Sequence, residues 1–251
     1  MASILGVDLS ITSYGDLVEK CAAWARGGES RAIAFVGLHN IMEAYDRPGF
    51  RETLHTADLR AIDGMPMTWI LRARGHREAS RVYGPDATLA LLDSAQKAGI
   101  PVGFYGGDER TLARLVSEIR RRYPDLRIVY QVSPPFRKLS AEEDEAIVAE
   151  MAESGMRFLF VGLGCPKQEA WVVAHRGRVP AVMFAVGAAF DFIAGTKPQA
   201  PRWMMRSGLE WAFRLATEPR RLAGRYLRNI PRFLYLLARE QVTKEDLVKA
   251  S

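Results

Sequence analysis

Features that would assign this chain of 251 residues to several common protein classes are scarce or missing. It has two cysteines, Cys21 and Cys165, without metal-ligand spacing, so no disulfide framework is indicated and a reducing compartment is expected. No apolar run approaches the roughly 20 residues that span a bilayer. The N-terminus carries Asp8 early and lacks the basic-then-apolar order of a signal peptide. These absences predict a cytoplasmic protein or one bound at the cytosolic face of a membrane.

Motifs that hold phosphates or metals through a fixed pattern are missing as well. There is no Gly-Lys-Ser/Thr phosphate loop, and Gly162-Leu-Gly164 lacks the third glycine of a dinucleotide-binding fingerprint. No two aspartates are separated by one residue, and no two of the four histidines have metal-ligand spacing on a helix. We therefore expect no metal site and no cofactor. If a diphosphate leaves during a reaction, arginines, Lys167 or helix N-termini must take up its charge.

Positive charge is abundant but confined to the C-terminal part of the chain. Residues 196–239 hold ten basic and two acidic side chains, a net charge of +8, whereas the whole chain carries +6 and the remainder therefore −2. Such a segment is expected to face an anionic partner. We accordingly predict an α/β body over residues 1–195 and a basic helical appendage over residues 196–251.

Apolar runs and helical patterns alternate along the body. Six runs are typical of buried strands: residues 32–36, 59–62, 102–105, 128–132, 158–161 and 181–186. Helical patterns lie between them, at residues 40–55, 65–74, 86–98, 110–123, 141–154 and 167–175. Ser140 and Glu143 have capping-box spacing at the start of the fifth. The alternation predicts an α/β fold, a Rossmann-like, mostly parallel sheet with helices on both faces, in which ligands bind at the carboxyl ends of strands.

The most informative segment, residues 161–169, reads Val-Gly-Leu-Gly-Cys-Pro-Lys-Gln-Glu and joins a predicted strand to a predicted helix. Gly162 and Gly164 permit close backbone approach, and the unpaired N–H groups of the new helix can bind an anion. Lys167 adds positive charge, and Gln168 adds an amide that both donates and accepts hydrogen bonds. The pattern predicts a site for a phosphorylated ligand.

Polar residues near other strand ends each have a functional and a structural interpretation. Asp63 can act as a general base or cap the next helix. Asn40 can bond a sugar or phosphate or serve as an N-cap, and Asp191 can bond a ligand or the local backbone. Arg81 can pair with a phosphate through two N–H groups or form a surface ion pair. A helix N-terminus would activate the Cys165 thiol, but no paired histidine marks it as a nucleophile.

The basic tail combines arginines with aromatic and aliphatic side chains. Five arginines recur at helical spacings: Arg214, Arg221, Arg225, Arg228 and Arg232. Pro219 and Pro231 are placed to begin two successive helices. Helices of this composition are typical of segments that lie in an anionic membrane interface. The apolar residues 234–237 argue against a nucleic-acid groove, and an arm that packs on the body or on a second subunit is the remaining alternative.

A series of short motifs runs in order along nearly the whole chain. They are Asn40, Ala57-Asp58 leading to Asp63-Gly64, Arg81-Val-Tyr-Gly, Gly103-Phe-Tyr-Gly-Gly107, residues 162–169, Val186-Gly-Ala-Ala-Phe-Asp191, Ala194-Gly195, Arg202-Trp203, Gly208-Leu-Glu-Trp211, Arg214-Leu215 and Glu218-Pro219. Each motif is weak alone. Their order and coverage together resemble the bacterial WecG/TagA/CpsF glycosyltransferases.

The resemblance implies an inverting transfer of a hexose-type sugar from a UDP donor to a polyprenyl-diphosphate-linked sugar at the inner membrane face. It implies exopolysaccharide or cell-wall polymer assembly and no metal. Asp63 matches the general base that deprotonates the acceptor hydroxyl. Asp191 falls in the nucleotide-binding region, and three further positions match substrate-holding residues: Asn40, Arg81 and Gln168. Three arginines match the arm that meets the membrane and closes over the leaving diphosphate: Arg214, Arg221 and Arg225.

The sequence departs from the family pattern beside the predicted base. Leu38 stands where many members carry threonine, His39 where they carry a small or aliphatic residue, and Met65-Pro66 follows Asp63-Gly64. Relatives use N-acetylmannosamine, its uronic acid or glucose, and the donor sugar stays open among these. Two other functions are alternatives: a nicotinamide-dependent oxidoreductase, disfavoured by the incomplete glycine fingerprint, and a noncatalytic adaptor that senses anionic lipid and a nucleotide.

Overall fold

A computed structural model describes residues 2–249 of the chain, with side chains described through residue 241. At the centre of this part lies a parallel sheet with strand order β4-β3-β8-β7-β5-β6. In chain order the strands are β3 (Arg31–Val36), β4 (Leu59–Ile62), β5 (Val102–Gly106), β6 (Ile128–Val132), β7 (Phe158–Gly162) and β8 (Val182–Ala185). Each strand predicted from the sequence is present, so the Rossmann-like parallel sheet is confirmed.

A short antiparallel hairpin, β1 (Ala2–Ile4) and β2 (Val7–Leu9), precedes the sheet and is missed by the sequence patterns. Its turn places Leu5 and Gly6 at φ values of 48° and 75°, the left-handed backbone of a two-residue hairpin turn. Strands of three residues are too short to show a clear alternation of apolar and polar side chains. A backbone bridge between Ser10 and Ala61 joins this segment to the β4 edge of the sheet.

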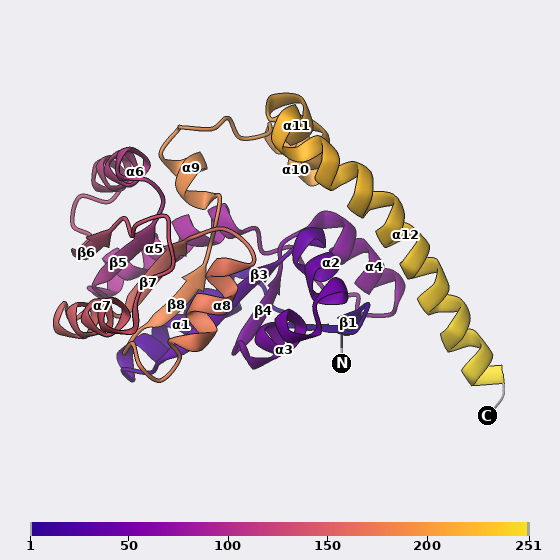
Figure 1. Cartoon of the computed structure of the whole chain (residues 1–251), viewed down its shortest axis with the longest axis horizontal. Helices are drawn as coiled ribbons and strands as arrows, with labels where there is room; N and C mark the ends of the chain where they lie inside the picture. Colours follow the sequence, from indigo (N-terminus) through magenta and orange to yellow (C-terminus); the bar gives the residue numbers. More distant parts are fainter. Residues whose placement is uncertain (1, 250–251) are drawn as a thin grey trace.

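Helices cover both faces of the sheet (Figure 1). On one face, α1 (Tyr14–Arg26), α5 (Gly84–Ala98), α6 (Glu109–Arg122) and α9 (Ala189–Ile193) pack their apolar side chains against the strands. On the other face lie α2 (Leu38–Asp46), α3 (Pro48–Thr56), α4 (Met65–Ala73), α7 (Ala141–Glu153) and α8 (Lys167–Ala174). The central strands are therefore buried on both sides, which is why they appear in the sequence as continuous apolar runs.

Local signals explain where several helices begin and end. The predicted capping box is confirmed, because Ser140 caps α7 and Glu143 reaches back to its backbone N–H. An equivalent box of Ser13 and Asp16 starts α1, a helix that the sequence patterns did not indicate. The single helix predicted over residues 40–55 is wrong. It is divided into α2 and α3, because Pro48 disfavours helical backbone at the residue before it.

The C-terminal arm, residues 196–249, contains α10 (Arg202–Arg206), α11 (Glu210–Thr217) and the long helix α12 (Pro219–Lys249). The helix start predicted at Pro219 is confirmed, but the one at Pro231 is wrong, because that proline lies inside α12. Pro231 has no N–H group, so the carbonyl of Leu227, four residues earlier, lacks its helical hydrogen bond. Leu227 is 75% exposed, so water can solvate that carbonyl. Buried side chains continue along α12 on both sides of the proline: Leu222, Asn229, Phe233 and Leu236. Packing on the body thus keeps the helix continuous across the proline.

The helix α12 runs along the side of the body formed by α2, α4 and the hairpin (Figure 1). Phe233 and Leu236 belong to the apolar cluster that these elements build together with α3. Ion pairs add to this contact: Arg74 with Glu240, and Arg232 with Asp46. The arm is therefore seated on the body through both apolar and charged contacts.

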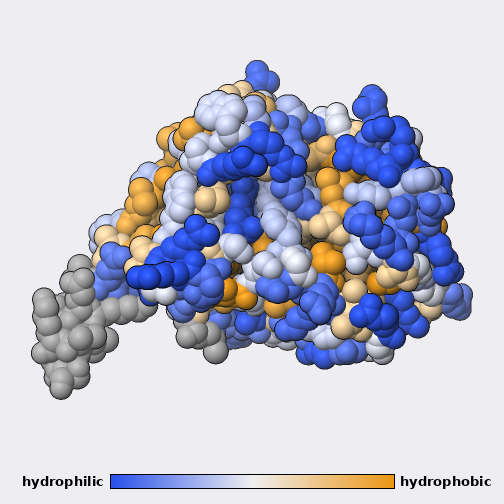
Figure 2. All heavy atoms as spheres, turned by 180° about the vertical axis from the view of Figure 1, so that it is seen from behind, coloured by the Kyte–Doolittle hydropathy of each residue, from blue (hydrophilic) through white to orange (hydrophobic). Residues whose placement is uncertain are grey.

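The outward side of the arm exposes large apolar side chains. They are Trp203, Leu209, Trp211, Leu227, Leu234 and Tyr235. Figure 2 shows hydrophobic residues along the edge of the molecule that leads to the grey end of the chain. Across the part of the chain that the structure describes, no helix is both long and apolar enough to span a bilayer.

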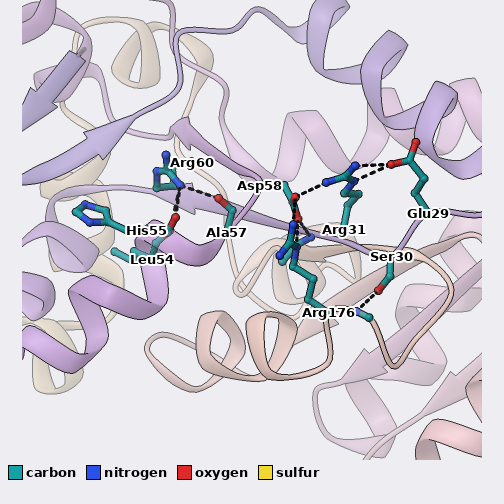
Figure 3. Close-up of polar contacts among 11 residues, drawn as sticks. Glu29, Ser30, Arg31, Leu54, His55, Ala57, Asp58, Arg60 and Arg176 are labelled. Carbon is teal, nitrogen blue, oxygen red and sulfur yellow. Dashed lines mark hydrogen bonds and ion pairs between the residues drawn. The ribbon is translucent and has the colours of Figure 1, made fainter.

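A network of ion pairs fixes the amino ends of β3 and β4 (Figure 3). Asp58, just before β4, accepts hydrogen bonds from Arg31 at 2.7 Å, from Arg176 at 2.9 Å and from the backbone N–H of Ala32 at 2.8 Å. Burial alone would raise the pKa of Asp58, but these hydrogen bonds hold it below its usual value. Beside it, Arg60 donates to carbonyl groups at the end of α3, those of Leu54, His55 and Ala57. The network therefore anchors the strand whose other end carries the predicted base.

We expect Asp58→Asn to lower the free energy of unfolding by about 2 kcal/mol, because it removes the charge that pairs with Arg31 and Arg176 in a nearly buried position. The pKa of Asp58 is lower in the folded than in the unfolded state. The stabilisation is therefore present above the unfolded pKa of about 4 and is lost as the pH falls further. Urea denaturation at neutral pH and at about pH 3 measures both effects. Glu118→Gln, which breaks exposed arginine pairs on α6, is the control; equal midpoints for the two variants would contradict the prediction.

Candidate functional site

The connections that leave the neighbouring strands β3 and β8 run to opposite faces of the sheet. β3 leads into α2 on one face, and β8 leads to α9 on the other. The connections after the neighbouring strands β5 and β7 diverge in the same way, to α6 and α8. In open α/β sheets ligands bind at the carboxyl edge near such divergences. The predicted site residues follow the strand ends there: Asp63 after β4, Asn40 after β3, residues 162–168 at and after β7, and Asp191 after β8. The topology thus gathers them at one edge of the sheet.

Asp63 directly follows β4. Its backbone N–H donates to the carbonyl of Val36 at 3.0 Å, and its Oδ1 accepts from the N–H of Gly84 at 3.3 Å. It does not cap the next helix, since Gly64 is the N-cap of α4. The residue keeps some accessible surface, but protein atoms surround its carboxyl densely. This loss of solvation raises the pKa of Asp63 to about 7, which suits a carboxylate that accepts a proton near neutral pH.

Arg81 joins three segments around this carboxyl. Its Nε donates to the backbone carbonyl of Asp63 at 2.7 Å, its Nη1 to that of Met205 at 3.2 Å, and its Nη2 pairs with Oε2 of Glu210 at 2.5 Å. The guanidinium carbon lies 4.2 Å from the centre of the Tyr83 ring. The side chains of Arg81 and Glu210 are each 14% exposed, so the pair is largely buried. Arg81 thereby connects a strand end to the arm, and its contact with substrate stays a prediction.

Asn40 lies in the first turn of α2 and is buried. Its Oδ1 accepts from the N–H of Gly37 at 3.1 Å, so it supports the helix start although Gly37 is the N-cap. Its Nδ2 donates to Oε1 of Glu169 at 2.9 Å and lies 3.3 Å from Sγ of Cys165. Asn40 therefore links α2 to the loop and helix that follow β7.

Gln168 is buried and bonded at both ends of its amide. Its Oε1 accepts from the N–H of Gly164 at 3.0 Å, and its Nε2 donates to the carbonyl of Ala185 at 3.0 Å and to Oε1 of Glu169 at 3.1 Å. The amide thus ties the loop after β7 to the end of β8. These contacts shape the loop, and a contact between Gln168 and substrate stays a prediction.

Glu169 is a candidate that the sequence reasoning missed. It is 1% exposed, and its Oε2 has no hydrogen-bond partner among the described residues. Burial raises its pKa to about 7. An unpaired buried carboxyl oxygen calls for a proton or a ligand donor. Its place in the 161–169 motif was the available signal, but an acid in the first turn of a helix is commonly only a partner of the helix dipole.

The open members of the loop after β7 are Gly164 and Lys167. A Cβ on Gly162 would lie 2.6 Å from the Phe190 ring, so the missing side chain makes room for α9. Gly164 has a φ of 79° and would meet no described atom within 4 Å, and Lys167 is exposed at the start of α8. Burial raises the pKa of the Cys165 thiol, which disfavours the thiolate that a nucleophile needs.

Asp191 lies on α9 and is paired within the protein. Its Oδ2 accepts from Nζ of Lys197 at 2.7 Å, and its Oδ1 accepts from Oγ1 of Thr196 at 3.3 Å. Lys197 also lies 3.8 Å from Glu218, at the residue before α12. A line of charges therefore runs from α9 to the arm, and a contact between Asp191 and a nucleotide stays a prediction.

Arg214 of α11 faces the same edge. Its charge lowers the pKa of Asp63, and its guanidinium lies 5.5 Å over the Phe192 ring. The Nε of Arg214 is buried and has no hydrogen-bond partner among residues with described side chains. Arg221, by contrast, pairs with Glu218 at 2.6 Å. Arg214 is therefore a cation held near Asp63 with an N–H group left to bind an anion.

Arg225 of α12 lies on the α2 side of the edge, close to His39. Burial, together with the charges of Arg225 and Arg228, lowers the pKa of His39 to about 4. The imidazole is therefore neutral at neutral pH, and its buried Nδ1 has no hydrogen-bond partner in the described part of the chain. The charge of Arg225 also opposes the rise in the pKa of the Cys165 thiol. The arm thus places cations near both the Asp63 side and the Asn40 side.

The structure brings the predicted residues together in two groups that the arm bridges. One surrounds Asp63 and includes Arg81 and Arg214, and the other surrounds Glu169 and includes Asn40 and Gln168. Among residues 2–241, no three His, Cys, Asp or Glu side chains are arranged to hold a metal ion. The edge therefore offers carboxyl groups that can exchange protons and cations that can bind phosphates.

Comparisons with known proteins point to one family. Residues 2–247 match the model of the Glycosyl transferase WecG/TagA/CpsF family. An N-acetylglucosaminyldiphosphoundecaprenol N-acetyl-beta-D-mannosaminyltransferase of Bacillus spizizenii is 29% identical over 193 residues, which cover 76% of this chain and 72% of that protein. A protein of the same name from Bacillus subtilis strain 168 is 27% identical over 241 residues, which cover 95% of this chain and 90% of that protein.

The raised pKa of Asp63 predicts a pH-dependent cost in stability. Its folded-state pKa of about 7 lies above the unfolded value near 4, so stability is lost as the pH rises through that interval. We expect Asp63→Asn, which cannot ionise, to be more stable than wild type above about pH 8 and equal to it below about pH 4. Thermal unfolding across this range measures the difference. Asp191→Asn, which loses an ion pair instead, should show no alkaline gain; the absence of a gain in Asp63→Asn would refute the assignment.

Proposed function

This chain belongs to the WecG/TagA/CpsF family of glycosyl transferases, and on that premise we propose that it transfers a sugar from a UDP donor to a sugar linked to undecaprenyl diphosphate. The acceptor follows the names of the relatives, which specify N-acetylglucosaminyldiphosphoundecaprenol as acceptor and an N-acetyl-β-D-mannosaminyl group as the part transferred. One observation carries the proposal: a carboxyl group with a pKa of about 7 stands at the carboxyl edge of the sheet beside Arg81 and the arm residue Arg214.

Asp63 is the proposed general base. As the acceptor hydroxyl oxygen forms its bond to the anomeric carbon of the donor, the Asp63 carboxylate takes the hydroxyl proton. The bond between the anomeric carbon and the UDP oxygen breaks, and its electron pair leaves with UDP. Attack on the side opposite the leaving group inverts the configuration at that carbon. The raised pKa of Asp63 supports this role, because it matches proton affinity to a neutral working pH.

The proposed donor site extends from the loop after β7 to α9. Lys167 and the N–H groups at the start of α8 attract the phosphates, and Asp191 contacts the nucleotide. The other members of this part are Gly162, Gly164, Gln168 and Asn40, with Arg81 on the Asp63 side. The open position of Gly164 and the exposure of Lys167 support the proposal.

Arginines of the arm are proposed to neutralise the leaving diphosphate in place of a metal ion: Arg214, Arg221 and Arg225. The buried Nε of Arg214, without a hydrogen-bond partner in the described part, supports this role. Arg221 would exchange the Glu218 carboxylate for a phosphate oxygen, whose geometry a guanidinium fits equally well. The arm would in this way contribute to the reaction as well as to the attachment of the protein to the membrane.

The arm is also proposed to rest on the anionic inner surface of the bacterial cell membrane, where the lipid-linked acceptor is held. Its exposed apolar side chains alternate with arginines along α10, α11 and α12. Apolar side chains that enter the interface and basic ones that meet lipid phosphates bind such a surface together.

We expect Asp63→Asn to lower transfer of labelled sugar to a polyprenyl-diphosphate-linked acceptor by about a thousandfold, because the acceptor hydroxyl loses its base. In the wild type, the rate should rise with pH to a plateau with a midpoint near 7, since the ionised carboxylate is the active form. Cys165→Ser is the control and should keep most activity. Full activity in Asp63→Asn would remove Asp63 as the base, and no transfer from any UDP-sugar would favour the adaptor alternative.

Replacing Leu234 and Tyr235 together by glutamate should weaken binding to anionic vesicles at least about tenfold, because it places charge on the exposed apolar side of α12. Vesicle sedimentation measures the effect, and circular dichroism checks that the variant is folded. Phe136→Glu is the matched control, since Phe136 is 90% exposed on the body and lies outside the arm. Equal binding by both variants would contradict an attachment through the arm.

A further inference from the structure

Glu210 brings a negative charge from the arm to the strand end that carries Asp63. It is the first residue of α11, where the helix dipole favours a carboxylate. Its Oε2 lies 2.5 Å from Nη2 of Arg81, and both side chains are 14% exposed. Separating such a pair leaves two poorly solvated charges, so the ion pair favours the arm in its seated position.

The turn that carries Glu210 has further contacts with the body. Gly208 has a φ of 72°, and a Cβ there would lie 2.5 Å from the ring of Trp69, so the turn packs closely against α4. The carbonyl of Met205, at the other end of the turn, accepts from Nη1 of Arg81 at 3.2 Å. α4 begins two residues after Asp63. Contacts with α4 and with Arg81, which both lie next to Asp63, therefore hold the turn at both of its ends.

We propose that Glu210 is a positioning residue for the transfer reaction: with the arm seated, it fixes the Arg81 guanidinium against the Asp63 carbonyl and thereby orients the Asp63 carboxyl toward the acceptor. The proposal rests on the proposed function, since it takes Asp63 as the base. Three of the five N–H groups of Arg81 are bonded to Asp63, Met205 and Glu210, so a change at Glu210 reaches Asp63 through one rigid group. A molecule whose arm is displaced then has an incomplete site.

The charged and titratable groups that face Asp63 come from several elements: Arg81, Glu210, Arg214, Tyr14 and Tyr83. Arg81 and Arg214 lower the pKa of Asp63, whereas the carboxylate of Glu210 raises it. Burial raises the pKa of Tyr14 to about 12 and raises that of Tyr83 as well, so both phenols are neutral near pH 7. Replacing Glu210 by glutamine therefore lowers the pKa of Asp63.

The test compares Glu210→Gln, Glu210→Asp and Glu240→Gln in the full chain. Glu240→Gln is the matched control, because it also removes an arm carboxylate from a largely buried pair with a body arginine. That pair, with Arg74, has a separation of 2.7 Å and side chains 16% and 18% exposed, and it lies at the opposite end of α4 from Asp63. Each variant is assayed for kcat, KM and the pH profile of transfer, and its thermal unfolding is measured.

Glu210→Gln is expected to lower kcat by about tenfold to a hundredfold at pH 7, with little change in the KM of the donor, because the carboxyl loses its orientation. The acidic midpoint of its pH profile should move below that of the wild type. Glu210→Asp should recover part of kcat and of the midpoint, since it restores the charge. Glu240→Gln should keep the wild-type kcat and profile.

Two results would overturn the positioning role. One is a wild-type kcat in Glu210→Gln. The other is an equal loss in Glu210→Gln and Glu240→Gln with no change in the pH midpoint, which would mean that Glu210 only attaches the arm. If Asp63→Asn keeps full activity, or if the wild type transfers no sugar, the proposed function fails and this proposal fails with it.

Discussion

The site depends on one largely buried guanidinium. Arg81 bonds the carbonyl of Asp63, the carbonyl of Met205 and the carboxylate of Glu210, and so holds a strand end and the arm in one arrangement. A planar group with donors in fixed directions suits this task, because each bond limits the orientation of the others. Lysine would supply the charge without the geometry. The arm consequently contributes to the environment of Asp63, and it does more than add positive charge to the surface.

Two poorly solvated carboxyl groups give the site its chemical character. Asp63 and Glu169 stand in different halves of the edge, and burial raises the pKa of each to about 7. Asp63 has cations beside it, whereas Glu169 is held by the neutral amides of Asn40 and Gln168. One carboxyl thus lies beside the cations of Arg81 and Arg214, and the other helps to order the loop after β7, where we propose that the donor binds. The neutral imidazole of His39, whose Nδ1 is buried, lies on the Glu169 side.

Much of this fold could be predicted from the sequence, because central parallel strands must be apolar on both faces and so appear as uninterrupted runs. The topology then places strand ends together, which is how Asp63 and Asn40 could be assigned to one edge. The partners of these residues could not be predicted, since Arg81 and Glu210 are 129 residues apart, as are Asn40 and Glu169. Pro231 was misjudged for a similar reason: local propensity favours a helix start there, and packing by Phe233 and Leu236 overrides it.

The proposed reaction is the transfer of one sugar, with inversion, onto a lipid diphosphate acceptor. The most direct measurement offers the protein a panel of UDP-sugars with undecaprenyl-diphosphate N-acetylglucosamine. The product is then identified by mass and its new linkage by NMR. We expect a product heavier by one sugar residue, with the anomeric configuration opposite to that of the donor. The absence of product with every UDP-sugar, or a product that retains the configuration of the donor, would contradict it.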